Sequence, residues 1–353
     1  RLAIVEAEVP MARVTLQTIA DEVGVSRMTV SNAFSRPDQL SAELRERVLA
    51  AAARLGYSGP DPAARALARG RTGVIGMLLT ESPMDAFRDD VAVGFVRAAA
   101  GALAAADYSL VLLHTGGEAS PTRDLAMDGA IVYACTPQDR GVADLQARRL
   151  PIVRVEGASM PGVSGVWIDD ETGAAAAARH LVELGHRDVA LVVTGLDLDG
   201  EPVTSAPPVG LAPIERRLAG WLPPLLDAGA RVRVVGTPFH LTDELLRERI
   251  ERLLEDPPTA VLAYSDLAAV EVLNAAAARG LRVPEDLSVV GFDDNPIAER
   301  VRPRLTTVRQ DLQRKGEAAV AAVLEQLDGA EPRDAAPIAT ELVVRESTAA
   351  PRT

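Results

Sequence analysis

The sequence contains little cysteine and few aromatic residues, and each scarcity excludes a class of function. Its 353 residues include one cysteine, Cys135, so an intramolecular disulfide and a zinc site built on several cysteines are both excluded. Cys135 lies in the apolar run GAIVYACTP, where we expect it to be a small buried hydrophobe. Aromatic residues make up 3% of the chain, so few rings are available to stack on a ligand.

Long apolar segments are also missing from the sequence. No run of about 18 or more apolar residues exists, so we expect no transmembrane helix and no membrane partner. The first residues include Glu6 and Glu8 and lack a basic stretch followed by an apolar one, so we expect no secretion signal in them. We therefore expect a cytoplasmic, nucleoid-associated protein, with residues 1–13 as an extension before the first domain.

Motifs for catalysis are absent as well. Neither half of the chain has a glycine-rich dinucleotide or phosphate loop after its first predicted strand, and no serine nucleophile elbow occurs. The four histidines lack metal-binding spacing, and His180 and His186 are expected to be structural parts of the helix end HLVELGH. We predict neither an enzyme nor a cofactor nor a metal site.

The charge is distributed unevenly along the chain. The net charge is −13, which by itself argues against binding to nucleic acid. Residues 11–72, however, hold nine arginines and six acidic residues, a net charge of +3, whereas residues 73–353 carry −15. A small basic head on a large acidic body is typical of a DNA-reading domain attached to a body that the duplex repels.

Three short helices are predicted in residues 14–56. Thr15 and Ser26 are good N-caps for the first two helices, and Ser41 is one for the third. Gly24 stands between the first two, where a tight turn requires a left-handed backbone. This helix–glycine–helix spacing is typical of a helix-turn-helix, although alone it fits a plain helical hairpin equally well.

In a helix-turn-helix, the start of the second helix faces base edges in the major groove. Arg27 is suited to guanine O6 and N7, and Met28 to apolar contact such as a thymine methyl group. The hydroxyl groups of Thr15, Ser26 and Ser31 are suited to phosphate contacts that set the register. The predicted DNA-contacting residues of the helical region are Thr15, Ser26, Arg27, Met28, Thr29, Ser31 and Asn32.

The head segment VTLQTIADEVGVSRMTVSNAFSRPDQLSAELRERVLAAAARLGY resembles the DNA-binding domain of the lactose-repressor (LacI/GalR) family, and the similarity extends over residues 14–348. The Pro-broken linker that follows has too few apolar residues to fold alone and is suited to ordering on a partner. The resemblance implies a hinge helix in the minor groove, with Leu67 as the wedge, Ala64 as its packing companion and Arg65 as a further contact. The sequence departs from the family pattern at two places: the GPDP linker is longer, and Asn32 stands where an arginine is common.

From residue 73 onward, apolar runs such as GVIGMLL and GAIVYA alternate with amphipathic helices, and a second such series begins near residue 171. This alternation predicts α/β architecture with doubly wound parallel sheets. The resemblance implies a periplasmic-binding-protein-like body of two subdomains with a ligand cleft at the carboxyl ends of the strands.

The predicted domains are the helix-turn-helix at 14–58, the hinge linker and helix at 59–72, the effector-binding and dimerisation domain at 73–346 and a tail at 347–353. The predicted subdomains of the body are 73–166 with 297–327, and 167–296 with 328–346.

Effector-contacting residues are carried over from the family by motif. Arg217 precedes LAGW, and Asp293 is the first acid of GFDD; both match ligand-contacting positions of relatives. For Asp266, a simple helix cap is nearly as good an interpretation, and the two aromatic residues are more often core than contact. The predicted effector-binding residues are Phe87, Tyr133, Glu156, Arg217, Ser265, Asp266 and Asp293.

Other features of the body are interpreted as follows. Trp221 is expected in the core, and Trp167 is ambiguous. The Pro-rich segment 194–213 is either a lid over the cleft or a solvated loop. No leucine heptad follows the last predicted strand, which favours a homodimer over a tetramer.

The sequence therefore predicts a transcriptional regulator, acting as a repressor of carbohydrate-utilisation genes. It would bind a near-palindromic double-stranded operator as a dimer, under the control of a small-molecule effector such as a sugar or a related polar metabolite. The alternatives are a solute-binding protein or a carbohydrate-processing enzyme with a fortuitous helical head, and a DNA-binding regulator that responds to no effector.

Overall fold

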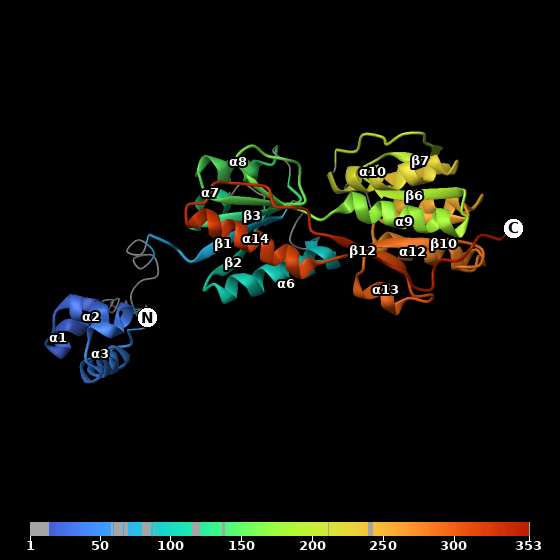
Figure 1. Ribbon diagram of the computed structural model, residues 1–353. Helices are drawn as coiled ribbons and strands as arrows, with labels where there is room; N and C mark the ends of the chain where they lie inside the picture. Colours follow the sequence, from blue (N-terminus) through green and yellow to red (C-terminus); the bar gives the residue numbers. More distant parts are fainter. Residues whose placement is uncertain are drawn as a thin grey trace, which may run out of the picture. The chain divides into compact units, whose positions relative to one another are not determined.

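The chain forms two compact units, residues 1–72 and 73–353, which we describe separately (Figure 1). This computed structural model describes residues 14–57, 59, 66, 70–79, 86–87, 89–114, 121–135, 138–210, 212–238 and 243–352. The predicted hinge residues Ala64, Arg65 and Leu67 lie outside the described residues. Within the described ranges, no helix is both long enough and apolar enough to cross a membrane.

The head is a small helical domain whose elements begin at the predicted caps. Its elements are α1 (Leu16–Val23), α2 (Arg27–Ser35), the 3-10 helix η1 (Pro37–Gln39) and α3 (Ala42–Arg54). The side chains of Thr15, Ser26 and Ser41 each accept a hydrogen bond from the backbone amide three residues later, which satisfies an otherwise free helix donor. Gly24 ends α1 with φ of 74°, as the turn requires. Small apolar side chains, including those of Ile19 and Val30, fill the space between the helices.

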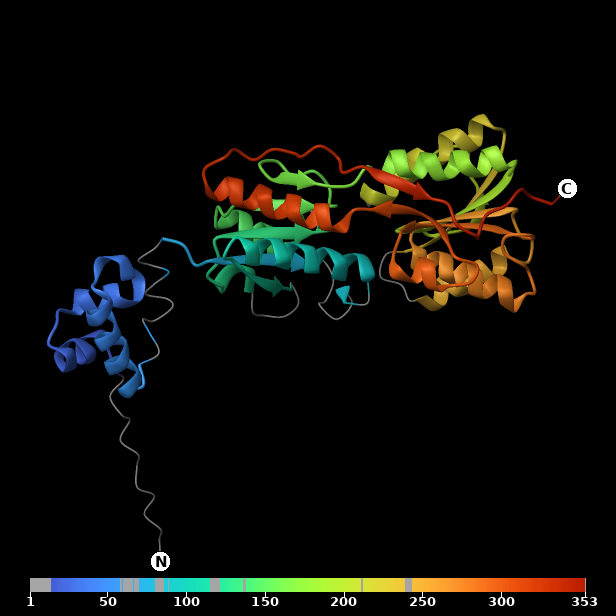
Figure 2. The same cartoon turned by 60° about the horizontal axis from the view of Figure 1, so that its bottom comes forward.

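The first subdomain of the body is built on a five-stranded parallel sheet in the order β2-β1-β3-β4-β5. Its strands are β1 (Val74–Leu79), β2 (Ser109–Leu113), β3 (Gly129–Tyr133), β4 (Ile152–Val155) and β5 (Ser164–Val166). Its helices are α6 (Asp90–Ala105), α7 (Pro121–Asp124), α8 (Arg140–Ala147) and α14 (Leu312–Leu327). Although α14 comes from late in the sequence, it lies beside α6 (Figure 2).

The second subdomain has a seven-stranded sheet in the order β12-β11-β10-β9-β6-β8-β7, in which the two outer strands are antiparallel to their neighbours. Its strands are β6 (Asp188–Thr194), β7 (Leu198–Pro202), β8 (Arg231–Thr237), β9 (Ala260–Ala263), β10 (Ser288–Asp293), β11 (Thr306–Gln310) and β12 (Thr340–Val343). Its helices are α9 (Asp170–Leu184), α10 (Ala212–Asp227), α11 (Asp243–Leu253), α12 (Asp266–Ala278) and α13 (Pro296–Arg300). Two sheets of mostly parallel strands match the predicted α/β body.

The subdomain boundaries differ from those expected after residue 296. We expected residues 297–327 in the first subdomain, but β11 pairs with β10 and β12 of the second sheet. Only α14 returns to the first subdomain. Residues 328–337 also stay with the first subdomain, where Ala335 donates its amide to Gly165 and Asp334 pairs with Arg154. The expectation assigned the whole range 297–327 to one subdomain, whereas the pairing of β11 is fixed only when the second sheet is assembled.

The segment 194–213 is not a free lid in its first half. Residues Leu198–Pro202 form β7, which pairs antiparallel with β8, and the amide of Val203 continues the pairing by donating to Val232. Arg249 and Arg252 of α11 bind Asp197 and Asp199, which fixes this edge to the rest of the subdomain. The first half of the segment therefore closes the edge of the sheet.

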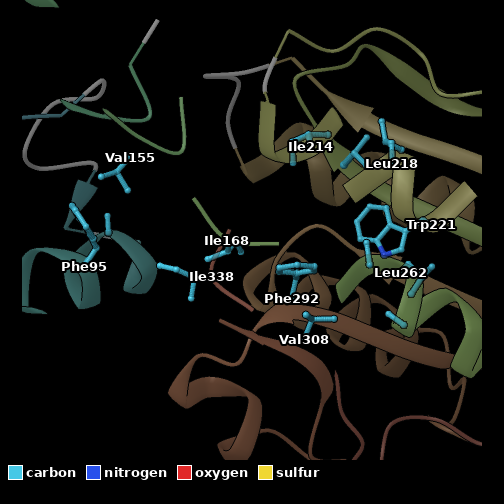
Figure 3. Close-up of a cluster of buried hydrophobic side chains, with 14 of the residues drawn as sticks. Phe95, Val155, Ile168, Ile214, Leu218, Trp221, Leu262, Phe292, Val308 and Ile338 are labelled. Carbon is cyan, nitrogen blue, oxygen red and sulfur yellow. The ribbon is translucent and has the colours of Figure 1, made fainter. Parts of the chain in front are cut away.

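The main apolar core continues from one subdomain into the other. Phe95 and Val155 of the first subdomain and Trp221 and Phe292 of the second belong to the same buried cluster, with Ile168 and Ile338 at the crossing between them (Figure 3). Trp221 is buried in this core, as predicted. Cys135 is buried in a smaller cluster of the first subdomain, also as predicted.

Candidate DNA-binding and effector sites

The start of α2 presents side chains to solvent on the face opposite its buried residues. Val30 and Ala33 pack inward, whereas Arg27 is exposed and 69% of Met28 is accessible. An apolar side chain so exposed on the first turn of a helix is available for contact with a partner surface. Both side chains are therefore accessible to a partner, which a helix that reads a groove requires.

The other predicted DNA contacts in the head differ in their burial and in the hydrogen bonds that they already make within the protein. Ser26 Oγ lies 2.8 Å from Thr29 Oγ1 while it caps the helix. Asn32 Nδ2 donates to Gln39 Oε1 at 3.1 Å, so η1 fixes its orientation. Ser31, like Asn32, is half-buried, whereas Thr15 is exposed at the start of α1. Of the seven predicted DNA contacts, Thr15 caps α1, and the other six lie at the cap or in the first two turns of α2.

In the body, Arg217 and Asp293, two of the predicted effector contacts, lie side by side. Arg217 Nη2 lies 3.5 Å from Asp293 Oδ1, and its guanidinium lies over the ring of Phe292 at 3.6 Å from the centroid. Arg217 Nε also donates to Asp170 Oδ1 at 2.9 Å. Burial raises the pKa of Asp293 well above its usual range, although Arg217 opposes that shift. Gln310 Nε2 donates to Asp293 Oδ1 at 2.7 Å and holds this carboxyl group in place.

Glu156 follows β4 and meets cations from both subdomains. Lys315 Nζ of α14 lies 2.7 Å from Oε1, and Arg216 Nη2 of α10 lies 3.0 Å from Oε2. Burial opposes ionisation of Glu156, but Lys315 and the two arginines outweigh it, so its pKa is below its ordinary value. Its φ of 59° is unusual for a residue other than glycine, and such backbone strain persists where surrounding contacts fix the residue.

Asp266 and Ser265 are engaged in supporting the loops around them. Asp266 is fully buried; Thr307 Oγ1 donates to its Oδ1 at 2.5 Å and the amide of Asn295 to its Oδ2 at 2.6 Å. Burial raises its pKa to about 7. Ser265 caps α12 by accepting from the amide of Ala268. Both carboxyl oxygens of Asp266 are thus occupied by Thr307 and Asn295, and the cap of α12 is Ser265 rather than Asp266.

The two predicted aromatic contacts are placed differently. Tyr133 ends β3 and stacks on Phe95 with a centroid separation of 4.9 Å. Burial, together with the nearby Asp89 and Glu156, raises the pKa of Tyr133 well above its usual range. Phe87 is exposed. The residue left ambiguous, Trp167, lies under the guanidinium of Arg154 at 5.2 Å from its centroid.

His180 and His186 fill structural positions, as predicted, and His180 Nε2 lies 3.0 Å from Thr348 Oγ1. His186 is buried, its Nδ1 lies 2.9 Å from Thr259 Oγ1, and its Nε2 contacts Ser288 and the carbonyl of Ala349. These contacts attach the end of the chain to the second sheet. Among the described residues, no group of three or more His, Cys, Asp or Glu is arranged to hold a metal ion.

Comparison with known proteins gives matches to both units. The model of bacterial regulatory proteins of the lacI family matches residues 15–59, and that of the periplasmic binding protein-like domain matches residues 178–348. The HTH-type transcriptional regulator Rv3575c of Mycobacterium tuberculosis is 35% identical, over 97% of this chain and 98% of its own length.

Solved structures with the same architecture include the lac repressor dimer bound to operator and the anti-inducer ONPF. It matches with a TM-score of 0.77 and 25% identity, over 96% of this chain and 99% of that one. A complex of the transcriptional regulator CelR with cellobiose matches with a TM-score of 0.67 and 29% identity, over 95% and 100%.

The chain belongs to the LacI family. It is accordingly a DNA-binding transcriptional regulator with a periplasmic-binding-protein-like body, and its relatives are regulators rather than enzymes. The sequence comparison and the fold thus confirm the predicted family and fold class.

In this LacI-family regulator, the sequence analysis did not single out four polar residues that lie beside the predicted effector contacts. Asp170, Arg216, Gln310 and Lys315 lie beside the predicted ones and bind them. One signal was present in the sequence, because Lys315 is the only lysine of the chain. The others stand next to predicted contacts or strand ends, where the sequence does not indicate which neighbour points inward.

Proposed function

We propose that this LacI-family regulator is a repressor that binds a near-palindromic operator as a homodimer and responds to a small polar effector in the body. The observation that carries the proposal is the pairing, in one chain, of a head with an exposed Arg27–Met28 turn and a body whose strand ends gather polar side chains. Two-fold symmetry of a dimer would be mirrored in the operator. Acting on DNA, the protein would work in the cytoplasm at the nucleoid.

The effector that best fits the cleft is uncharged and rich in hydroxyl groups. Lys315, Arg216 and Arg217 face Glu156, Asp170 and Asp293, three basic side chains against three acidic ones. A ligand with a net charge would leave one of these groups without compensation, which is costly in a buried site. Hydroxyl groups both donate and accept, so a sugar can satisfy either partner. Repression of carbohydrate-utilisation genes follows from such an effector.

The operator proposal is tested by fluorescence anisotropy on duplexes selected from a random pool, at two salt concentrations. We expect selection of a palindromic site, binding in the nanomolar range and a steep loss of affinity with salt. Leu67→Ala, at the wedge position implied by the family, should weaken binding strongly. Absence of binding above the non-specific level at low salt would contradict the proposal.

A second candidate is a regulator that responds to no effector. It is favoured by one observation: the polar groups of the cleft already satisfy one another. A thermal-shift screen with sugars, sugar acids, polyols and nucleosides separates the two candidates. A stabilising sugar that also lowers operator affinity supports effector control, and no response across the panel supports the second candidate.

A further inference from the structure

The only lysine of the chain is buried where the two subdomains of the body meet. Lys315 lies in the first turn of α14, directly after the crossing from β11, and 1% of it is accessible. A buried ammonium group is costly unless it is paired and hydrogen-bonded. Glu156 Oε1 lies 2.7 Å from Nζ, and Nζ also donates to Gln310 Oε1. Gly316 allows this placement, because a Cβ there would lie 2.5 Å from the Cβ of Ala98 on α6.

These contacts belong to a closed ring of seven side chains, which we call the cleft ring. Each member contacts the next through an ion pair or hydrogen bond, and the last contacts the first. In order, the cleft ring is Lys315, Glu156, Arg216, Asp170, Arg217, Asp293 and Gln310.

The cleft ring crosses between the subdomains at two places. Glu156 of the first subdomain binds Arg216 of the second, and Lys315 of the first binds Gln310 at the end of β11. The pair of Lys315 and Glu156 lies within the first subdomain. The other four contacts lie within the second subdomain, where Gly220 brings α10 close enough to α9 for two consecutive arginines to reach Asp170. Contacts that cross between the two subdomains oppose their separation, in addition to the apolar core that they share.

We propose that the cleft ring is a latch that joins the two subdomains of the body without a ligand, and that Lys315 is the positioning residue that completes it by holding Glu156 toward Arg216. This inference rests on the proposed function for its biological role, because the effector would act by opening or replacing the latch. A molecule that opens the ring must donate to Glu156 and accept from Arg216 and Lys315, which hydroxyl groups can do in one small ligand.

The single lysine allows a direct test on the full chain, without DNA or effector. A small amine-acylating reagent is applied, and acetylation of Lys315 is followed by peptide mass spectrometry. Buried Lys315 should react slowly in the wild type. Arg216→Gln removes a contact across the subdomains without touching Lys315, and it should raise the acetylation rate about tenfold, the factor that corresponds to about 1.4 kcal/mol.

The matched control is Arg233→Gln. Arg233 is also a buried arginine of the second subdomain, but its partners Asp188 and Asp256 lie in that subdomain. This variant should leave the acetylation rate within about twofold of the wild type. The latch is refuted if Arg216→Gln leaves the rate unchanged, or if Arg233→Gln raises it equally while both proteins remain folded by circular dichroism.

The positioning role of Lys315 is tested by a double-mutant cycle on melting temperature. Lys315→Met should destabilise strongly because it leaves Glu156 without its counter-ion, and Lys315→Met with Glu156→Gln should recover much of that loss. Additive effects would overturn the positioning role. If Lys315→Met fails to fold, the acetylation test on Arg216→Gln still decides the latch. If the acetylation rates change as expected but the protein binds no operator, the proposed function is refuted and the latch is retained.

Discussion

The head and the body place their candidate functional residues in opposite environments. Arg27 and Met28 are exposed, and the structure gives them no role in the core of the head. Arg217, Asp293 and Glu156 are buried; Arg217 pairs with Asp293, and Glu156 pairs with Arg216 and Lys315. A substitution of Arg27 or Met28 should therefore change a contact with a partner and leave the fold intact. A substitution in the cleft should change stability and function together.

The largest effect is expected from Arg217→Met. The variant keeps the apolar stem but leaves Asp170 and Asp293 buried without their shared cation, which costs about 3–5 kcal/mol of unfolding free energy. Urea denaturation followed by tryptophan fluorescence measures the loss. Arg231→Met is the matched control, since Arg231 is half exposed and its contacts at 3.8 and 3.9 Å are worth about 0–1 kcal/mol. Equal losses of unfolding free energy in the two variants would contradict the larger contribution that we assign to the buried ion pairs.

This comparison also shows where sequence reasoning succeeded. The caps Thr15, Ser26 and Ser41 were correctly identified because a cap acts within four residues of its own position. Arg217 and Asp293 came from motifs of the family, and the structure brings them together.

The remaining cleft residues could not be predicted, because their partners lie far away in the sequence. Asp170 lies 46 and 47 residues from the two arginines that bind it, and Lys315 binds Glu156 from the other end of the body. Such pairs are fixed by sheet order and helix packing. The same reason explains the misassigned strand β11, whose neighbours β10 and β12 are known only once the sheet is assembled.

The next largest effect concerns pH. Burial raises the pKa of Asp266 to about 7, so between about pH 4 and pH 7 the folded protein keeps a proton that the unfolded chain has lost. The free energy of unfolding should therefore fall as the pH rises through this window. Asp266→Asn should remove that component, which has an upper limit of about 4 kcal/mol. Denaturation at pH 4.5, 6 and 7.5 measures it, and an unchanged pH dependence would contradict the assignment.

A smaller effect, confined to DNA binding, is expected from Arg27→Ala. Loss of a bidentate contact to guanine should cost about 1–3 kcal/mol of operator affinity and relax specificity at one base pair. Because Arg27 is exposed, the melting temperature should hardly change. Anisotropy with the selected operator and single-base variants measures both. Arg54→Ala, an exposed arginine near the end of α3, is the control and should retain base specificity. A loss of stability as large as the loss of affinity would contradict a direct role in reading bases.

The smallest effect is expected from Ser26→Ala and Ser41→Ala, which together distinguish a helix cap from a DNA contact. Ser26 and Ser41 each accept a hydrogen bond from the amide three residues later, so replacing either with alanine should destabilise the head by about 1 kcal/mol. Only Ser26 is a predicted phosphate contact. Ser26→Ala should therefore weaken operator binding more than Ser41→Ala does, and equally for all duplex sequences, since phosphate contacts carry no base information. Thermal denaturation and anisotropy on matched samples measure both quantities. Equal operator affinities for the two variants would mean that Ser26 acts on DNA only through the helix that it begins.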